Sequence, residues 1–165
     1  MKKLISRNPF TGTINREFEY AKASDVATAI ERGVEGLKLQ AGRNSVDKIS
    51  MLDSFAKNLE KDADKFANLI TSEMGKPITQ SKAEVNKVIN HARYYIKNFD
   101  VLTRPTLVPH EAKKKTLIKY KPLGIIYYIV PFNFPFWLMF KGGMSSLILG
   151  NSIILRPSQL TPCLG

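Results

Sequence analysis

Asn133 is the residue whose type and position best suit catalysis in this sequence. It stands in the segment Pro131 to Pro135, directly after an apolar run with the composition of a buried strand. Open parallel sheets place their ligand contacts at the carboxyl ends of the strands. A neutral carboxamide at such a point can donate a hydrogen bond to a developing oxyanion. The alternative is a turn residue whose side chain bonds its own backbone.

Other residues capable of chemistry are few. Cys163 stands in Thr-Pro-Cys-Leu-Gly with no base beside it, so we interpret it as an ordinary thiol. His91 and His110 lie far apart and have no neighbours at ligand spacing, so the sequence predicts no metal site. Arg156, read by itself, is a cation in water at the end of a strand.

The elements that must position Asn133 are a strand, a helix and a second strand. Residues 124–130 predict a strand buried on both faces, ended by Pro131. Pro135 suits the first position of a helix that runs to about residue 149, with Gly150-Asn151 as its stop. Residues 152–156 predict a second buried strand. This βαβ order predicts parallel strands joined by a right-handed crossover.

The same segment resembles the region around the Pro-Trp-Asn-Phe-Pro motif of the aldehyde dehydrogenase superfamily. The spelling Asn-Phe-Pro-Phe-Trp followed by Gly-Asn is typical of bacterial succinate-semialdehyde dehydrogenases. The resemblance covers essentially the whole chain but only about the first third of a family member. The stretches that carry it are Asn8 to Gly12, Glu73 to Pro77, Pro122 to Trp137, Gly150-Asn151 and Arg156 to Pro162.

The resemblance implies roles for these residues in an NAD(P)-dependent reaction. Asn133 would steady the oxygen of the thiohemiacetal formed with a catalytic cysteine. The nicotinamide side of the cofactor would be touched, mainly by backbone, by Ile129, Val130, Pro131 and Phe132, the last of which replaces the usual Trp. Glu73 to Pro77 is a family motif that we interpret as a helix stop and turn without a catalytic role.

The resemblance implies that Arg156, Ser158 and Gln159 would bind the adenosine side of the cofactor. Arg156 stands where the family has a Lys that bonds the ribose, so the charge is kept and the geometry changes. Gln159 stands where the family often has an acid. A neutral side chain there removes a repulsion against a 2′-phosphate, so the resemblance allows either NAD or NADP.

Upstream of the βαβ unit, apolar residues recur at helical spacing. Ser24 predicts the N-cap of a first helix that runs to about Gln40. The turn at Asn8 to Thr13 and the strand pattern at Ile14 to Tyr20 predict a small N-terminal hairpin or an extended arm. The remaining predictions are helices from Asn44 or Ser45, at Ala63 to Met74 and from about Ile78 to Val101, and a hairpin of Thr106 to Val108 with Lys115 to Tyr120. The class is α/β.

Combined with the resemblance, this order divides the chain into three parts. Residues 1–105 are predicted to be the helical part of a cofactor-binding domain, 106–121 an oligomerisation-type hairpin, and 122–165 an incomplete first βαβ unit. Assembly through the hairpin, as a homo-oligomer or with a C-terminal fragment, is the expected partnership. A structural module that pairs with another subunit through this hairpin, without turnover, is the first alternative function.

Composition favours the cytoplasm and does not favour a membrane or nucleic acid. The chain has one Cys, and its N-terminus lacks an apolar signal segment. The longest apolar stretch is interrupted at Pro131, Asn133 and Pro135, so it does not predict a membrane span. The net charge of +11 raises nucleic-acid binding as a second alternative. No aromatics interleave with the cluster Lys113 to Lys115, which also suits the guarding of an edge strand.

The predicted function is the oxidation of an aldehyde to an acid, with succinate semialdehyde as the candidate, and it is limited by three features that the resemblance does not find in this chain. The resemblance puts the family's glycine turn, general-base Glu and nucleophilic Cys beyond Gly165. Because the chemistry requires a thiolate, we expect no activity from this chain alone, whether it is half of a split enzyme or a gene remnant. We also expect the apolar faces of Ile125, Tyr127, Ile153 and Leu155 to lack partners, since one crossover helix cannot cover both faces of a sheet.

Overall fold

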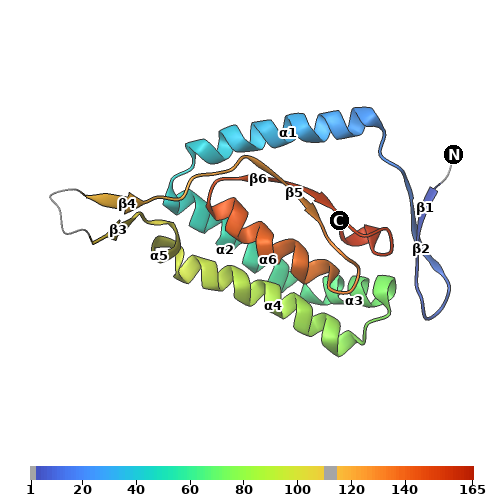
Figure 1. The fold of residues 1–165 in the computed structure, drawn as a ribbon. Coiled ribbons are helices and arrows are strands. Elements are labelled where there is room, and N and C mark those ends of the chain that lie inside the picture. Colours follow the sequence, from blue (N-terminus) through green and yellow to red (C-terminus); the bar gives the residue numbers. More distant parts are fainter. Residues whose placement is uncertain (1–2, 110–114) are drawn as a thin grey trace.

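The computed structural model describes residues 3–109 and 115–165 (Figure 1). Helices predominate, and the strands come in three separate pairs. The elements in chain order are β1 (Lys3–Arg7), β2 (Ile14–Glu19), α1 (Ala23–Gly42), α2 (Ser45–Lys61), α3 (Ala63–Met74), α4 (Ile78–Lys97), α5 (Phe99–Thr103), β3 (Thr106–Val108), β4 (Thr116–Ile118), β5 (Ile125–Ile129), α6 (Pro135–Ile148), β6 (Ser152–Arg156) and the 3₁₀ turn η1 (Pro162–Leu164).

The βαβ unit is present as predicted. β5 and β6 pair in parallel, with Ile125 opposite Ser152 at one end and Ile129 opposite Arg156 at the other. The helix α6 between them begins at Pro135 and is followed by Gly150 with a φ of +90°. The predicted hairpins are also present, since β1 pairs with β2 and β3 with β4, both antiparallel.

The faces of the β5–β6 pair are covered by two different helices. Figure 1 shows α1 along one side of the pair and α6 along the other. A Cβ on Gly36 of α1 would come within 2.9 Å of Ser152 Oγ, and one on Gly33 within 3.0 Å of Ile125 Cδ1. Glycines at these positions therefore let α1 lie close to the sheet.

This arrangement corrects two sequence predictions. Ile125 and Ile153 do not lack partners, because α1 meets the first and Gly143 of α6 lies against the second. The strand β5 is also not buried on both faces, since Tyr127 is 57 % and Ile129 is 62 % exposed. The first prediction was wrong for Ile125 because it counted only the crossover helix and left out α1, and wrong for Ile153 because α6 covers it, whereas Tyr127 is exposed as predicted.

The core lies between α6 and the helices α2, α3 and α4. Ile70, Val85 and Val88 are fully buried there. Aromatic rings of α6 pack into the same cluster, with Phe136 5.2 Å from Phe66 and Phe140 4.9 Å from Phe55 between ring centroids. Helices α2, α3 and α4 therefore form the surface against which α6 packs.

Two helix boundaries differ from the prediction. The predicted helix from Ile78 to Val101 breaks at Asn98, whose side-chain amide donates to the carbonyl of Tyr94 at 2.8 Å beside the backbone N–H of the same residue at 3.0 Å. The first helix is capped at Lys22 and not at Ser24, because the Asp25 carboxylate accepts the Lys22 N–H at 2.8 Å. The N-cap of the second helix is Asn44, one of the two predicted residues.

Candidate functional site

Asn133 lies in the turn between the carboxyl end of β5 and the start of α6. The residue is exposed, and its backbone carbonyl accepts a hydrogen bond from Lys76 Nζ at 3.1 Å. Within the described part of the chain, the Asn133 carboxamide makes no hydrogen bond, so the alternative of an Asn bonded to its own turn is not what the structure has. The backbone of the turn is held, and the amide remains available to a ligand.

A buried ion pair lies beneath this turn. The Lys76 ammonium contacts the Glu84 carboxylate, and the two side chains are only 5 % and 2 % exposed. Glu84 Oε1 accepts the backbone N–H groups of Phe136 at 3.0 Å and Trp137 at 2.9 Å, in the first turn of α6. The Lys76 ammonium also lies 4.1 Å from the ring centroid of Phe134. The end of the turn that leads into α6 is therefore held by one pair of charges.

The strand ends adjoin as the parallel pairing requires. Ile129 lies opposite Arg156, and the Val130 N–H donates to the Arg156 carbonyl at 3.1 Å. Val130 is buried, whereas Ile129, Phe132 and Arg156 are exposed. The apolar side chains of Ile129 and Phe132 and the cation of Arg156 thus lie at the same end of the two strands. These are the carboxyl ends of the strands, where an open parallel sheet binds its ligand.

The remaining predicted residues lie in the segment after β6. Gln159 is exposed, and the Ser158 hydroxyl accepts the Leu160 N–H at 3.2 Å. Leu160 and Phe132 line a cavity of about 400 Å³ together with Ile5, Arg7, Pro9, Glu73, Met74 and Thr161. The structure therefore brings the two halves of the predicted site to one side of the molecule, and their binding roles stay predictions.

Glu73 connects the N-terminal hairpin to the end of the described chain. Its Oε1 accepts from Ser6 Oγ at 2.6 Å and from the Cys163 N–H at 2.9 Å. Burial, and then a hydrogen bond with Glu73, raise the pKa of the Cys163 thiol. Because the thiolate is the nucleophile, a raised pKa argues for the ordinary thiol that the sequence suggested.

Asn151 anchors the other end of β5. Its side-chain oxygen accepts the N–H groups of Leu123 at 2.6 Å and Gly124 at 3.0 Å, and its amide donates to the Ser146 carbonyl at 3.0 Å. The Gly150-Asn151 pair, predicted only as a helix stop, therefore also connects the end of α6 to the start of β5.

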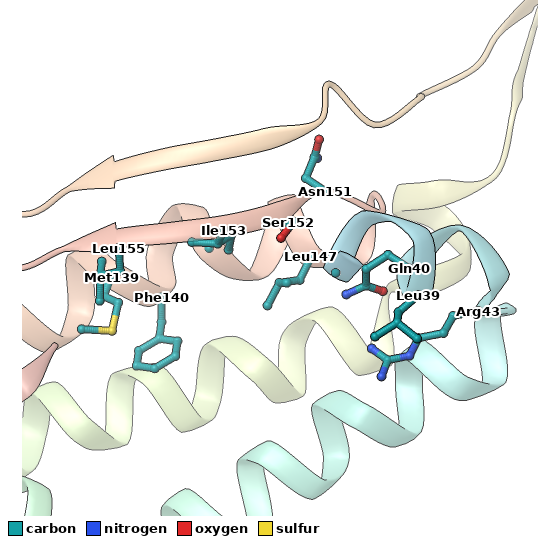
Figure 2. A pocket seen from close by; sticks show the side chains of 12 residues that line it. Leu39, Gln40, Arg43, Met139, Phe140, Leu147, Asn151, Ser152, Ile153 and Leu155 are labelled. Atoms are coloured by element: carbon teal, nitrogen blue, oxygen red, sulfur yellow. The ribbon is translucent and has the colours of Figure 1, made fainter. Parts of the chain in front are cut away.

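A separate cavity of about 380 Å³ lies between α1, α6 and β6 (Figure 2). Figure 2 shows Leu39, Gln40 and Arg43 at one end and Ile153 and Leu155 of β6 farther along. The lining, as far as the described residues go, contains none of the predicted site residues. We therefore do not assign this cavity to the candidate site.

Sequence reasoning missed Lys76 and Glu84. Lys76 belonged to a motif interpreted as a helix stop, which is correct for Gly75 with its φ of +75° but incomplete. Glu84 stands on a helix in which nothing local distinguishes it from exposed acids. The signal that could have found the pair was the uncapped start of α6, because the Phe134 side chain has no atom able to accept the free N–H groups.

The family model for the aldehyde dehydrogenase family matches residues 2–165. The chain belongs to the aldehyde dehydrogenase family. Among curated relatives, it is 33 % identical over 154 residues to a succinate semialdehyde dehydrogenase [NAD(P)+] of Escherichia coli K12, covering 92 % of this chain and 33 % of the relative. It is 28 % identical over 163 residues to an N-succinylglutamate 5-semialdehyde dehydrogenase of Novosphingobium aromaticivorans, covering 99 % and 34 %.

Solved structures of aldehyde dehydrogenases have the same fold over the length of this chain. A succinic semialdehyde dehydrogenase from Streptococcus pyogenes, solved in complex with NADP+, superposes with a TM-score of 0.91 at 23 % identity and covers 98 % of this chain and 35 % of that one. An aldehyde dehydrogenase from Brucella melitensis superposes with a TM-score of 0.90 at 21 % identity, covering 99 % and 34 %. The chain thus spans about a third of the length of these aldehyde dehydrogenases.

Three further findings concern the alternatives. Across residues 3–109 and 115–165, no helix combines the length and apolar character needed to span a membrane. His91 Nε2 lies 3.2 Å from the Lys141 carbonyl and packs against Trp137, while His110 lies outside the described residues. Lys113 and Lys114 of the basic cluster also lie outside them, so nucleic-acid binding is not tested.

Proposed function

We propose that this chain contributes the oxyanion donor and one edge of the cofactor site to an NAD(P)-dependent aldehyde dehydrogenase. The reaction is the oxidation of an aldehyde to its acid, with succinate semialdehyde as the candidate substrate. The observation that carries the proposal is Asn133, whose carbonyl is held by Lys76 while its carboxamide makes no bond in the described chain. A donor whose backbone is already held stabilises developing charge with less reorganisation during the reaction.

The cofactor assignment rests on the edge where β5 and β6 end. Exposed Ile129 and Phe132 supply apolar surface for a nicotinamide ring, and exposed Arg156 supplies a cation toward the ribose and phosphate side. Bound there, the nicotinamide would accept the hydride that the substrate loses. Gln159 carries no negative charge, so a 2′-phosphate meets no repulsion from it, and we propose that both NAD and NADP are accepted.

The nucleophile must come from residues other than these. Cys163 is held by its backbone N–H on Glu73, and burial raises its pKa, which disfavours the thiolate. We therefore propose that the 165 residues do not turn over aldehyde by themselves and act with a C-terminal portion that supplies the cysteine and the general base. We propose the cytoplasm as the compartment in which this thiol chemistry takes place.

The test is an assay of NAD(P)H formation with succinate semialdehyde. The chain is measured alone and after coexpression with the C-terminal two-thirds of a related aldehyde dehydrogenase. Turnover is expected only in the mixture, and Asn133→Ala should lower kcat by about a hundredfold or more. Asn68→Ala, at an exposed position on α3, is the matched control and should leave kcat unchanged. Turnover by the chain alone, or full activity of Asn133→Ala, would contradict the proposal.

One observation favours a second candidate, a subunit that assembles through its hairpin without turnover. Figure 1 shows β3 and β4 extending away from the helices. Leu107, Leu117 and Ile118 on this hairpin are 59 %, 60 % and 51 % exposed. Exposed apolar side chains of this size on a short sheet suit contact with another chain. Sedimentation of the wild-type chain and of Leu107→Ser/Leu117→Ser tests the assembly, and the NAD(P)H assay of the coexpressed mixture tests turnover. A loss of mass in the double variant together with no turnover in the wild-type mixture would favour the second candidate, whereas turnover would contradict it.

A further inference from the structure

The start of α6 lacks a cap of its own. Pro135 is its first residue, and Phe134, at the N-cap position, has no side-chain acceptor for the free N–H groups. Unsatisfied N–H groups at a helix start are costly when buried, and Phe136 is 3 % exposed. The need for an acceptor is therefore greatest at the place where the turn bearing Asn133 enters the helix.

Glu84 meets this need from α4, 52 positions earlier in the sequence than Phe136. One carboxylate oxygen accepts both the Phe136 and Trp137 N–H groups, and the other contacts Lys76. A carboxylate at a helix N-terminus is favoured by the helix dipole, and its hydrogen bonds are charge-assisted. Glu84 thus fixes the direction in which the chain leaves the turn.

Lys76 holds the residues of the turn that come just before α6. Its ammonium donates to the Asn133 carbonyl at 3.1 Å and lies against the Phe134 ring. Because the side chains of Lys76 and Glu84 are 5 % and 2 % exposed, neither charge has water to replace its partner. Loss of one charge therefore disturbs the group that the other holds.

We propose that Lys76 and Glu84 are positioning residues for the Asn133 carboxamide. The pair holds the backbone that follows the Asn133 Cα, at its own carbonyl and at the start of α6, and so limits the directions in which the side-chain amide can point. Neither residue touches substrate or cofactor in this assignment. The inference rests on the proposed function for the meaning of Asn133, whereas the positioning itself is independent of turnover.

The first arm of the test needs no activity. Amide hydrogen exchange at Phe136 and Trp137 is compared in the wild-type chain, Glu84→Ala and Glu84→Gln. Loss of a charge-assisted bond should raise exchange at these two amides in Glu84→Ala by about tenfold or more. Glu84→Gln keeps an acceptor oxygen and should rescue part of the protection. Glu60→Ala is the matched control, since Glu60 contacts Arg93 of another helix at an exposed position.

The second arm measures kinetics in the coexpressed mixture. Lys76→Met/Glu84→Gln removes both charges together, so no uncompensated charge is buried, and it retains the acceptor at the helix start. We expect kcat to fall by about tenfold or more, with the KM for NAD(P) within about twofold of wild type. Glu60→Ala should change neither constant.

The outcomes separate the two proposals. Unchanged exchange at Phe136 and Trp137, or an equal rise throughout the chain, would overturn the positioning role. If exchange rises locally in Glu84→Ala but kcat is unchanged in Lys76→Met/Glu84→Gln, the pair holds the turn without contributing to the catalytic role of Asn133. That result would overturn the link between the pair and catalysis. If the wild-type mixture gives no turnover, the proposed function fails, and the exchange arm still decides whether the pair fixes the turn.

Discussion

Helix α2 is capped by residues of its own first turn, whereas α6 is capped by a carboxylate on another helix. At α2, the Asn44 side chain accepts the Asp47 N–H at 3.0 Å, and Asp47 accepts the Asn44 N–H at 3.3 Å. Both residues are exposed. At α6, Glu84 is buried and carries a partner charge. A local cap can be deleted with a small effect, whereas a long-range buried cap connects several elements at once.

The largest expected effect comes from removing the long-range cap. Glu84→Ala leaves the Lys76 charge buried without its partner and two N–H groups of α6 unsatisfied. We expect the free energy of unfolding to fall by about 3–5 kcal/mol, measured by urea denaturation. A loss below about 1 kcal/mol would mean that the pair is hydrated in solution and that the contrast with α2 does not hold.

Removing the local cap of α2 should have a smaller effect on stability. Asn44→Ala should lower the free energy of unfolding by about 1 kcal/mol, because water can still reach the N–H groups that lose their acceptor. Ser45→Ala is the control, since Ser45 is the first residue of α2 and not its cap. An equal loss in the two variants would contradict the assignment of Asn44 as the cap.

Removing one charge of an exposed ion pair should have the smallest effect on stability. Lys82 on α4 contacts Asp64 on α3 at 2.8 Å, but the two side chains are 50 % and 78 % exposed. Lys82→Gln should change the free energy of unfolding by less than about 1 kcal/mol, and by less still in high salt. A loss comparable to that of Glu84→Ala would show that burial does not set the strength of these pairs.

Where a signal lies within a few residues, the sequence predicted most of the structure, the N-cap at Ser24 being the exception. The strands and helix around Asn133, the stop at Gly75 and the cap at Asn44 each follow from short patterns. The break at Asn98 was missed because the apolar periodicity continues through it into Phe99. Coverage of the β5–β6 pair by α1 was missed because Gly33 and Gly36 carry no apolar signal, although they allow the close approach to Ile125 and Ser152.

The candidate site likewise contains residues that a local sequence signal marks and residues that only the tertiary structure shows. Asn133 and the strand ends beside Arg156 were found because motif and strand order mark them, although their binding roles stay predictions. Lys76 and Glu84 were not found, because a helix-stop motif and an acid on a helix face look alike whether exposed or buried. Their significance depends on what lies above them in space, which is the start of α6.

The sequence by itself determined the family, the order of the elements and the turn that presents Asn133, because each depends on residues close together along the chain. The tertiary structure alone decided which charges hold that turn and which helix covers the second face of the sheet. The physical reason is that the net effect of a hydrogen bond or an ion pair depends on burial, and burial is a property of the packed elements.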